Sequence, residues 1–195
     1  PGVRRLPGRP RLAFLLPGVG DQYQGLGRAL YRAEPVFAAA VDECVELAMQ
    51  RCGADLRPVL FADPPTTQEG APGFLGQAAQ GPDGQDPLEH AEIAHPFLFT
   101  VQYALARLLA HRGVTPDLLV GYSLGEYVAA CLAGVFTLSD ALWLVVERAR
   151  LIEAAPTGRM LAVAAGEERL REARGDSASE AGSYTPLTLP TIYSV

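Results

Sequence analysis

The chain has 195 residues, 49% hydrophobic and 19% charged, so it contains enough apolar sequence to bury a core and is not disordered throughout. Its 16 basic and 22 acidic residues give a net charge of −6, which argues against non-specific nucleic-acid binding. No apolar run approaches the roughly 18 residues needed to cross a bilayer. The cysteines lack metal-site spacing (Cys44, Cys52 and Cys131). We expect reduced thiols, a cytoplasmic location and no membrane contact.

Both ends of the chain differ in composition from the middle. Residues 1–10 are rich in Arg and Pro and do not begin with Met, which is typical of an interdomain linker. Residues 183–195 are rich in Thr, Pro and Tyr and resemble one reading frame of a sequencing-library adapter. We expect a non-native tail there, the alternative being a natural loop punctuated by Pro, and exclude it from functional reasoning.

The first half of the chain begins with a short apolar run, Leu12–Leu16, closed by Pro-Gly and typical of a buried strand. A Gly-rich loop follows over Val19–Gly25, and Leu26–Arg32 can form a short helix. The apolar spacing predicts a helix over Glu34–Cys52, with Pro35 in its first turn. Asp63–His90 holds five Gly and five Pro and is predicted to be a long loop.

The second half alternates helices and strands. Pro96–His111 is predicted to be a helix, with Pro96 near its first turn and Gly113 just past its end. The remaining predictions are a strand at 117–122, helices at 125–134 and 137–155, a strand at 160–165 and a polar helix at 167–174. This order indicates an α/β fold with a parallel sheet.

One motif in this pattern points to chemistry. Gly121-Tyr-Ser123-Leu-Gly125 directly follows a predicted strand and precedes a predicted helix. Such a strand-to-helix turn, called a nucleophile elbow, exposes a serine Oγ at the carboxyl edge of a sheet, and the two glycines avoid side-chain clashes. Backbone amides at the helix start can then stabilise an oxyanion. The alternative is an ordinary turn punctuated by Gly.

Several segments in order carry a family resemblance. They are Pro17-Gly-Val-Gly-Asp-Gln22, Gly121-Tyr-Ser-Leu-Gly-Glu126, Tyr127–Gly134 and Arg148. Together they resemble the malonyl-CoA:acyl-carrier-protein transacylase family, in particular the acyltransferase domains of modular type I polyketide synthases. The likeness extends over about residues 11–168. It implies an α/β-hydrolase-like large subdomain over 11–159 and, over 160–182, only the start of a ferredoxin-like small subdomain.

The resemblance implies a two-step acyl transfer. A malonyl or methylmalonyl group would pass from coenzyme A to Ser123, then to the phosphopantetheine thiol of an acyl carrier protein, with no bound cofactor or metal and with a ketosynthase as the expected neighbour in the chain. The backbone N–H groups of Leu124 and Val19 would form the oxyanion hole. Family members usually have Gln where Val19 stands, but a main-chain donor does not require it. They often have His where Tyr122 stands, so Tyr122 either packs beside the elbow or contacts substrate.

Arg148 lies 25 residues after Ser123 and matches the family arginine that pairs with the free carboxylate of the acyl group. A guanidinium binds a carboxylate through two parallel hydrogen bonds. The alternative is a solvated helix arginine, and Arg150 serves as the internal control.

The three histidines do not include the expected base, which the family places further downstream. His111 should lie at the opposite edge of the sheet from the elbow, and His90 should be solvated in the long loop. His95 matches a family position often held by Gln; it either contacts substrate or is a helix-entry histidine with a satisfied hydrogen bond. We therefore expect this stretch alone to be inactive.

The sequence is compatible with two other functions. An α/β-hydrolase-type esterase or thioesterase would have the same elbow, but this assignment does not account for residues 17–22 or for Arg148. A non-catalytic acyltransferase-like docking domain could lack the base. The resemblance implies that the choice between malonyl and methylmalonyl depends largely on a segment further downstream. The upstream specificity region, His90–His95, matches neither usual pattern.

Overall fold

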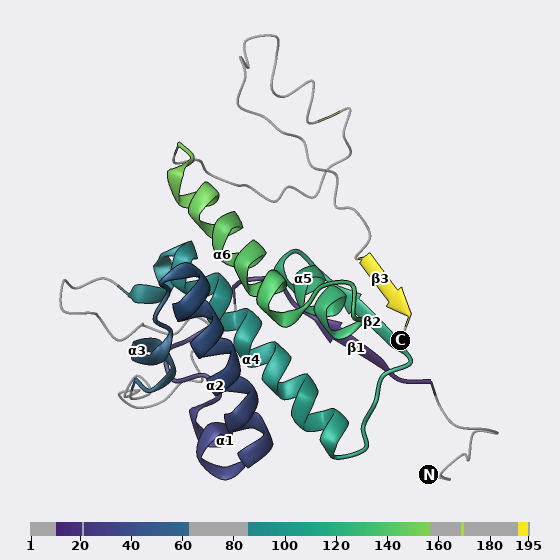
Figure 1. The fold of residues 1–195 in the computed structure, drawn as a ribbon. Helices are drawn as coiled ribbons and strands as arrows, with labels where there is room; N and C mark the ends of the chain where they lie inside the picture. The colour runs from purple at the N-terminus through teal and green to yellow at the C-terminus, as the bar shows by residue number, and fades with distance from the viewer. Residues whose placement is uncertain (1–10, 21, 63–85, 157–168, 170–190, 195) are drawn as a thin grey trace. The chain divides into compact units, whose positions relative to one another are not determined.

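The computed structural model describes residues 11–20, 22–62, 86–156, 169 and 191–194. The chain divides into two compact units, Pro1–Ala154 with Pro190–Val195, and Ala155–Leu189. Most of the second unit lies outside the described residues, and so do the strand predicted at 160–165 and nearly all of the helix predicted at 167–174. The fold below is that of the first unit (Figure 1).

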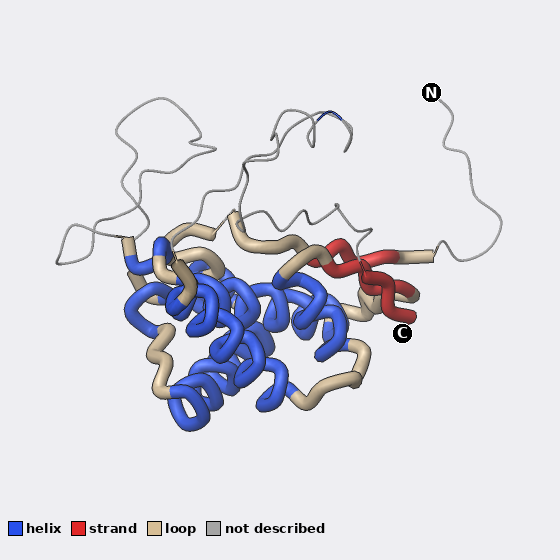
Figure 2. Tube along the Cα trace, turned by 90° about the horizontal axis from the view of Figure 1, so that it is seen from above, coloured by secondary structure: helices blue, strands red, loops and turns tan. Residues whose placement is uncertain are grey.

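The sheet is built on two parallel strands, β1 (Ala13–Leu16) and β2 (Leu118–Gly121), in the register Ala13 with Leu118 and Leu16 with Gly121. The helices between them form the crossover that a parallel pair requires. This confirms the predicted α/β character. Leu16 is buried, whereas Leu15 is 75% exposed. The helices lie on one side of the strands, as Figure 2 shows from above.

The third strand departs from the all-parallel expectation. β3 (Thr191–Ser194) pairs antiparallel with β2, with Val120 opposite Ile192. A strand edge presents a row of backbone donors and acceptors that another extended segment can pair with. The segment that we set aside as a tail therefore contributes to the sheet. Its non-native origin stays a prediction.

Helix α4 (Ala91–His111) is the centre of the helical layer and packs against α2 (Pro35–Cys52) and α6 (Leu138–Ala154). Its Phe97 and Phe99 are fully buried, as is Phe37 of α2. In length and composition α4 could cross a membrane, but 72% of its apolar window is buried inside the protein. It is a core helix, and its burial supplies much of the apolar contact that stabilises the fold.

α4 begins five residues earlier than predicted, so the expectation that Pro96 lies near its first turn is wrong. A short 3-10 helix at Pro87–Glu89, capped by Asp86, leads into the His90 carbonyl, which accepts from the Ile93 and Ala94 N–H groups. The helix thus begins upstream of Pro96, which lies in its second turn and has no N–H to donate to Glu92 O. Part of the predicted 63–90 loop is therefore helical, and residues 63–85 lie outside the described residues.

The remaining boundaries follow local signals. α1 (Arg28–Ala33) and α5 (Leu124–Leu132) lie where short helices were predicted. α6 starts after Thr137, whose Oγ1 accepts from the Asp140 N–H at 3.1 Å, as an N-cap does. Gly113 has φ 80° and ends α4 as predicted. The four-residue α3 (Arg57–Leu60) was missed because it is too short to show helical periodicity.

Candidate active site

Ser123 occupies a sharp turn between β2 and α5. It is exposed, and its φ of 52° and ψ of −115° make it the single non-glycine residue with positive φ among the described residues. Such a backbone conformation costs about 1–3 kcal/mol and persists where the surrounding structure enforces it. The predicted elbow is therefore present, and the serine side chain is available to a substrate.

Two glycines enforce this turn, as the motif predicted. A Cβ on Gly121 would lie 2.5 Å from both Cα and N of Glu126. A Cβ on Gly125 would lie 1.9 Å from the carbonyl oxygen of Leu16. Because both obstacles are backbone atoms, a side chain at either position requires the strands or α5 to move. The end of β1 is thus pressed against the first turn of α5.

The loop after β1 is brought to the same place. A Cβ on Gly18 would lie 3.1 Å from Ser123 Cβ and 3.3 Å from the Tyr122 ring. The Tyr122 side chain is itself half exposed beside this loop. Pro17 O accepts a hydrogen bond of 3.2 Å from Gln102 Nε2, and the Gly20 N–H donates to Gln22 Oε1 at 2.7 Å. Segments far apart in the sequence therefore meet around the serine.

Two backbone amides come from the segments next to this position. Leu124 is the first residue of α5, so its N–H has no acceptor within the helix. Val19 follows Gly18 in the loop and is exposed. A helix start beside an anionic group is electrostatically favourable. The backbone thus offers the elements that an oxyanion site requires.

Arg148 comes from α6 and is half-buried beside α4 and α5. Its Nη1 lies 3.2 Å from His95 Nδ1, and its Cζ lies 5.8 Å from the centre of the Tyr127 ring. Tyr127 is the fourth residue of α5, the helix that begins directly after Ser123. Within the described part of the chain, no carboxylate lies within ion-pair distance of Arg148.

Arg150, two residues further on, has quite different surroundings. It pairs with Glu147 at 2.6 Å and with Glu92 at 3.8 Å, and it also donates to the Cys52 carbonyl. Its charge is thus compensated by the protein itself. The two arginines of one helix therefore differ in their partners, and Arg148 lacks a described anionic partner.

His95 is 6% exposed, and the expectation that it sits at the helix entry is wrong, since it lies in the second turn of α4. Burial lowers its pKa below the ordinary value, the charge of Arg148 lowers it further, and Glu153 partly opposes both. The ring is therefore neutral at neutral pH. Since a guanidinium only donates, Nδ1 accepts from Arg148 and the ring proton is on Nε2.

The other two histidines lie at the two ends of α4. His90 is the N-cap residue of α4 rather than part of a loose loop, and its Nδ1 lies 3.9 Å from Glu153. His111 is the last residue of α4, about 30 Å along that 21-residue helix. All three histidines are described, and none is hydrogen-bonded to Ser123. Within the described residues there is also no cluster of metal-ligating side chains.

Gln102 is the residue that the sequence analysis missed. It is 8% exposed, and its Oε1 has no partner among the described residues while Nε2 holds the loop at Pro17. Gln102 and His95 are seven residues apart, so they lie on one face of α4. Two polar side chains at that spacing on an otherwise apolar face were the available signal.

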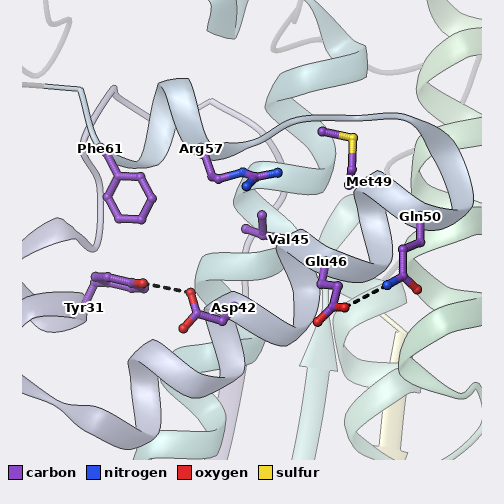
Figure 3. A pocket seen from close by; sticks show the side chains of 8 residues that line it. All are labelled: Tyr31, Asp42, Val45, Glu46, Met49, Gln50, Arg57 and Phe61. Carbon is purple, nitrogen blue, oxygen red and sulfur yellow. Dashed lines mark hydrogen bonds between the residues drawn. The ribbon is translucent and has the colours of Figure 1, made fainter.

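A cavity of about 510 Å³ lies elsewhere, between α1, α2 and α3 (Figure 3). In that view Tyr31 donates to Asp42 and Gln50 donates to Glu46 along one wall. None of the predicted site residues lines it. Ser123 lies instead just after β2, where Gly18 of the loop after β1 approaches it.

Comparison with known proteins agrees with this arrangement. Residues 13–187 match the family described as "Acyl transferase domain". The chain is 40% identical over 162 residues to a phenolphthiocerol/phthiocerol polyketide synthase protein of Mycobacterium tuberculosis, covering 83% of this chain and 10% of that protein.

Solved structures give the same result. The acyl transferase domain of SpnD, in complex with 2-(pent-4-yn-1-yl)malonyl, is 42% identical with a TM-score of 0.59, over 78% of this chain and 32% of that one. A type II polyketide synthase acyl-carrier protein in complex with its malonyl-transacylase (PlMCAT:AntF) is matched at 30% identity and a TM-score of 0.57, over 75% of this chain and 40% of that one. The chain thus spans well under half the length of these proteins, and it belongs to the acyl transferase domain family, among relatives that are polyketide synthases and malonyl transacylases.

Proposed function

We propose that this chain is part of an acyltransferase that loads a malonyl-type group from acyl-CoA onto an acyl carrier protein through an acyl-serine ester. The observation that carries the proposal is the pair formed by a strained, exposed Ser123 and a half-buried Arg148 without a described carboxylate partner. A cation partly withdrawn from water is stabilised by a counter-ion, and an acyl group with a free carboxylate supplies one on binding.

In the first half-reaction, Ser123 Oγ attacks the thioester carbonyl and its proton goes to a base. The carbonyl oxygen gains negative charge, which the N–H groups of Leu124 and Val19 would stabilise. The C–S bond then breaks and coenzyme A leaves as the thiol. In the second half-reaction the phosphopantetheine thiol of the carrier protein attacks the ester, and Ser123 recovers its proton.

The base that we propose for this scheme is a histidine further along the same polypeptide, as the family resemblance implies. Serine is a poor nucleophile without such a base. Because none of His90, His95 and His111 is hydrogen-bonded to Ser123 in the described structure, we propose that none of them takes this role and that these residues alone do not transfer acyl groups. No bound cofactor is required, since acyl-CoA and the carrier arm are substrates. A carrier-protein partner is supported by the related malonyl-transacylase that was solved with one.

The test uses the whole polypeptide that contains this chain. It is incubated with malonyl-CoA or acetyl-CoA, and the acyl adduct is measured by intact mass in wild type, Ser123→Ala, Arg148→Ala and Arg150→Ala. We expect no adduct in Ser123→Ala, and in Arg148→Ala about a tenfold loss or more for malonyl with little change for acetyl, as loss of a charge-assisted hydrogen bond does. Arg150→Ala is the matched control and should retain both.

Other outcomes identify the alternatives. Steady release of coenzyme A without a lasting adduct, and without transfer to a carrier protein, would indicate an esterase or thioesterase. Absence of both adduct and coenzyme A release would indicate a docking domain without catalysis.

A further inference from the structure

Arg148 is held by two neutral groups, one on each neighbouring helix. His95 of α4 accepts from Nη1 at 3.2 Å, and the Tyr127 ring of α5 lies 5.8 Å from Cζ. We propose that His95 is a positioning residue that fixes the Arg148 guanidinium through Nδ1 and thereby sets the preference for acyl groups with a free carboxylate. This rests on the proposed function, in which Arg148 binds that carboxylate.

The chemistry of the pair allows one arrangement of protons. The guanidinium has five N–H donors and no acceptor, so the imidazole nitrogen facing it must be unprotonated. A protonated ring would place two cations together in a buried position. The charged groups that act on His95 among the described residues are both on α6, Arg148 and Glu153. At the start of α4, His90 lies 3.9 Å from Glu153 and Glu92 lies 3.8 Å from Arg150.

Fixing the guanidinium matters because arginine is flexible. An arginine side chain has substantial rotamer entropy to lose when it is ordered by a ligand. His95 accepts from one of the five guanidinium N–H groups of Arg148, and together with the face of the Tyr127 ring it fixes the plane of the guanidinium. The other N–H groups stay available for a bidentate carboxylate. Part of the ordering is thus complete before the acyl group arrives, which favours binding of malonyl over acetyl.

A purely structural role is the competing explanation, because His95 also packs between α4 and α6. The two differ in which substrate is affected. A loss of packing would disturb the elbow and lower acylation from every donor. A loss of Arg148 positioning would weaken only donors with a carboxylate, and any side chain with an acceptor near the place of Nδ1 would restore them.

The experiment compares His95→Leu, which removes the acceptor, with His95→Asn, which keeps an amide oxygen close to the position of Nδ1. In the polypeptide that contains this chain, kcat and KM are measured with malonyl-CoA and acetyl-CoA. We expect His95→Leu to raise KM for malonyl-CoA about tenfold with kcat changed less than about twofold, as loss of one hydrogen bond to a charged group does. His95→Asn should recover most of the malonyl KM.

An equal loss for malonyl and acetyl in His95→Leu, or no recovery in His95→Asn, would overturn the proposal. A failure of the proposed function would give different results. Wild type would then form no acyl adduct, or Arg148→Ala would keep the preference for malonyl. If His95→Leu does not fold, NMR titration of His95 in Arg148→Met decides instead. Removing the neighbouring charge should raise the pKa of His95, and an unchanged titration would overturn the contact.

Discussion

The two halves of the candidate site are built by different means. In the elbow half, made of Pro17–Gly20 and Gly121–Gly125, close approach of backbone to backbone sets the geometry. In the arginine half, made of His95, Tyr127 and Arg148, three side chains from three helices hold one another. The elbow half therefore fails when atoms are added, whereas the arginine half fails when a polar partner is removed.

The largest expected effect comes from adding one methyl group to the elbow half. Gly125→Ala places a Cβ 1.9 Å from the Leu16 carbonyl oxygen and 2.5 Å from its carbon, and backbone cannot move aside cheaply. We expect a loss of about 3 kcal/mol or more in the free energy of unfolding, measured by urea denaturation.

The matched control for this change is Gly53→Ala. Gly53 has φ 68° at the end of α2 and nothing within 4 Å of an added Cβ. Its cost is then only the left-handed backbone, about 1 kcal/mol. Similar losses in the two variants would contradict the packing explanation.

Gln102 allows the two halves to be separated by substrate. Gln102→Leu removes the 3.2 Å hydrogen bond to Pro17 O and frees the loop that carries Val19. Because this loop serves the reacting carbonyl, acylation from malonyl-CoA and acetyl-CoA should fall together, by about tenfold. The rates of acyl-serine formation measure this. A loss confined to malonyl would place Gln102 in the arginine half instead.

The strain at Ser123 gives a smaller effect of opposite sign. Ser123→Gly relieves the positive φ, so we expect the free energy of unfolding to rise by about 1 kcal/mol while acylation is lost. Ser123→Ala removes the same hydroxyl but keeps the strain, and is the control. Equal stability of the two variants in urea denaturation would show that the turn is not strained.

The elbow half could be read from the sequence, and the arginine half only partly. Gly121, Ser123 and Gly125 lie within five residues, so local spacing together with the flanking strand and helix determines their geometry. Val19 and Arg148 came from the family resemblance. The contact of Arg148 with His95 joins residues 53 apart, and depends on how α4 and α6 pack, which spacing alone does not specify.

The fold shows the same division. Strands and long helices with clear periodicity were predicted, and the Thr137 and Gly113 boundaries followed capping chemistry. The start of α4 was missed because His90–His95 has no strong N-cap side chain and Pro96 suggested a later beginning. The pairing of β3 with β2 was not predicted, because an open strand edge accepts any extended segment regardless of side-chain pattern.

The smallest expected effect is a pH dependence of stability that belongs to the arginine half. The folded pKa of His95 lies below the value near 6.5 of the unfolded chain, first because of burial and then because of Arg148. Above about pH 6.5 both states hold a neutral ring, so the group contributes no pH dependence. Below about pH 6.5, His95 binds a proton in the unfolded chain but stays neutral in the folded protein. Stability therefore falls as the pH falls toward the folded pKa. The slope from this one site cannot exceed about 1.4 kcal/mol per pH unit.

His95→Asn removes this titration and leaves His90 and His111 in place. Urea denaturation at about pH 7.5 and about pH 5.5, on either side of the unfolded pKa, should therefore show a smaller loss of stability in the variant than in wild type. Equal losses in wild type and His95→Asn would mean that His95 is protonated as easily in the folded protein as in the unfolded chain. The arginine half would then not be held by a neutral acceptor, because a protonated ring has no lone pair to offer the Arg148 guanidinium.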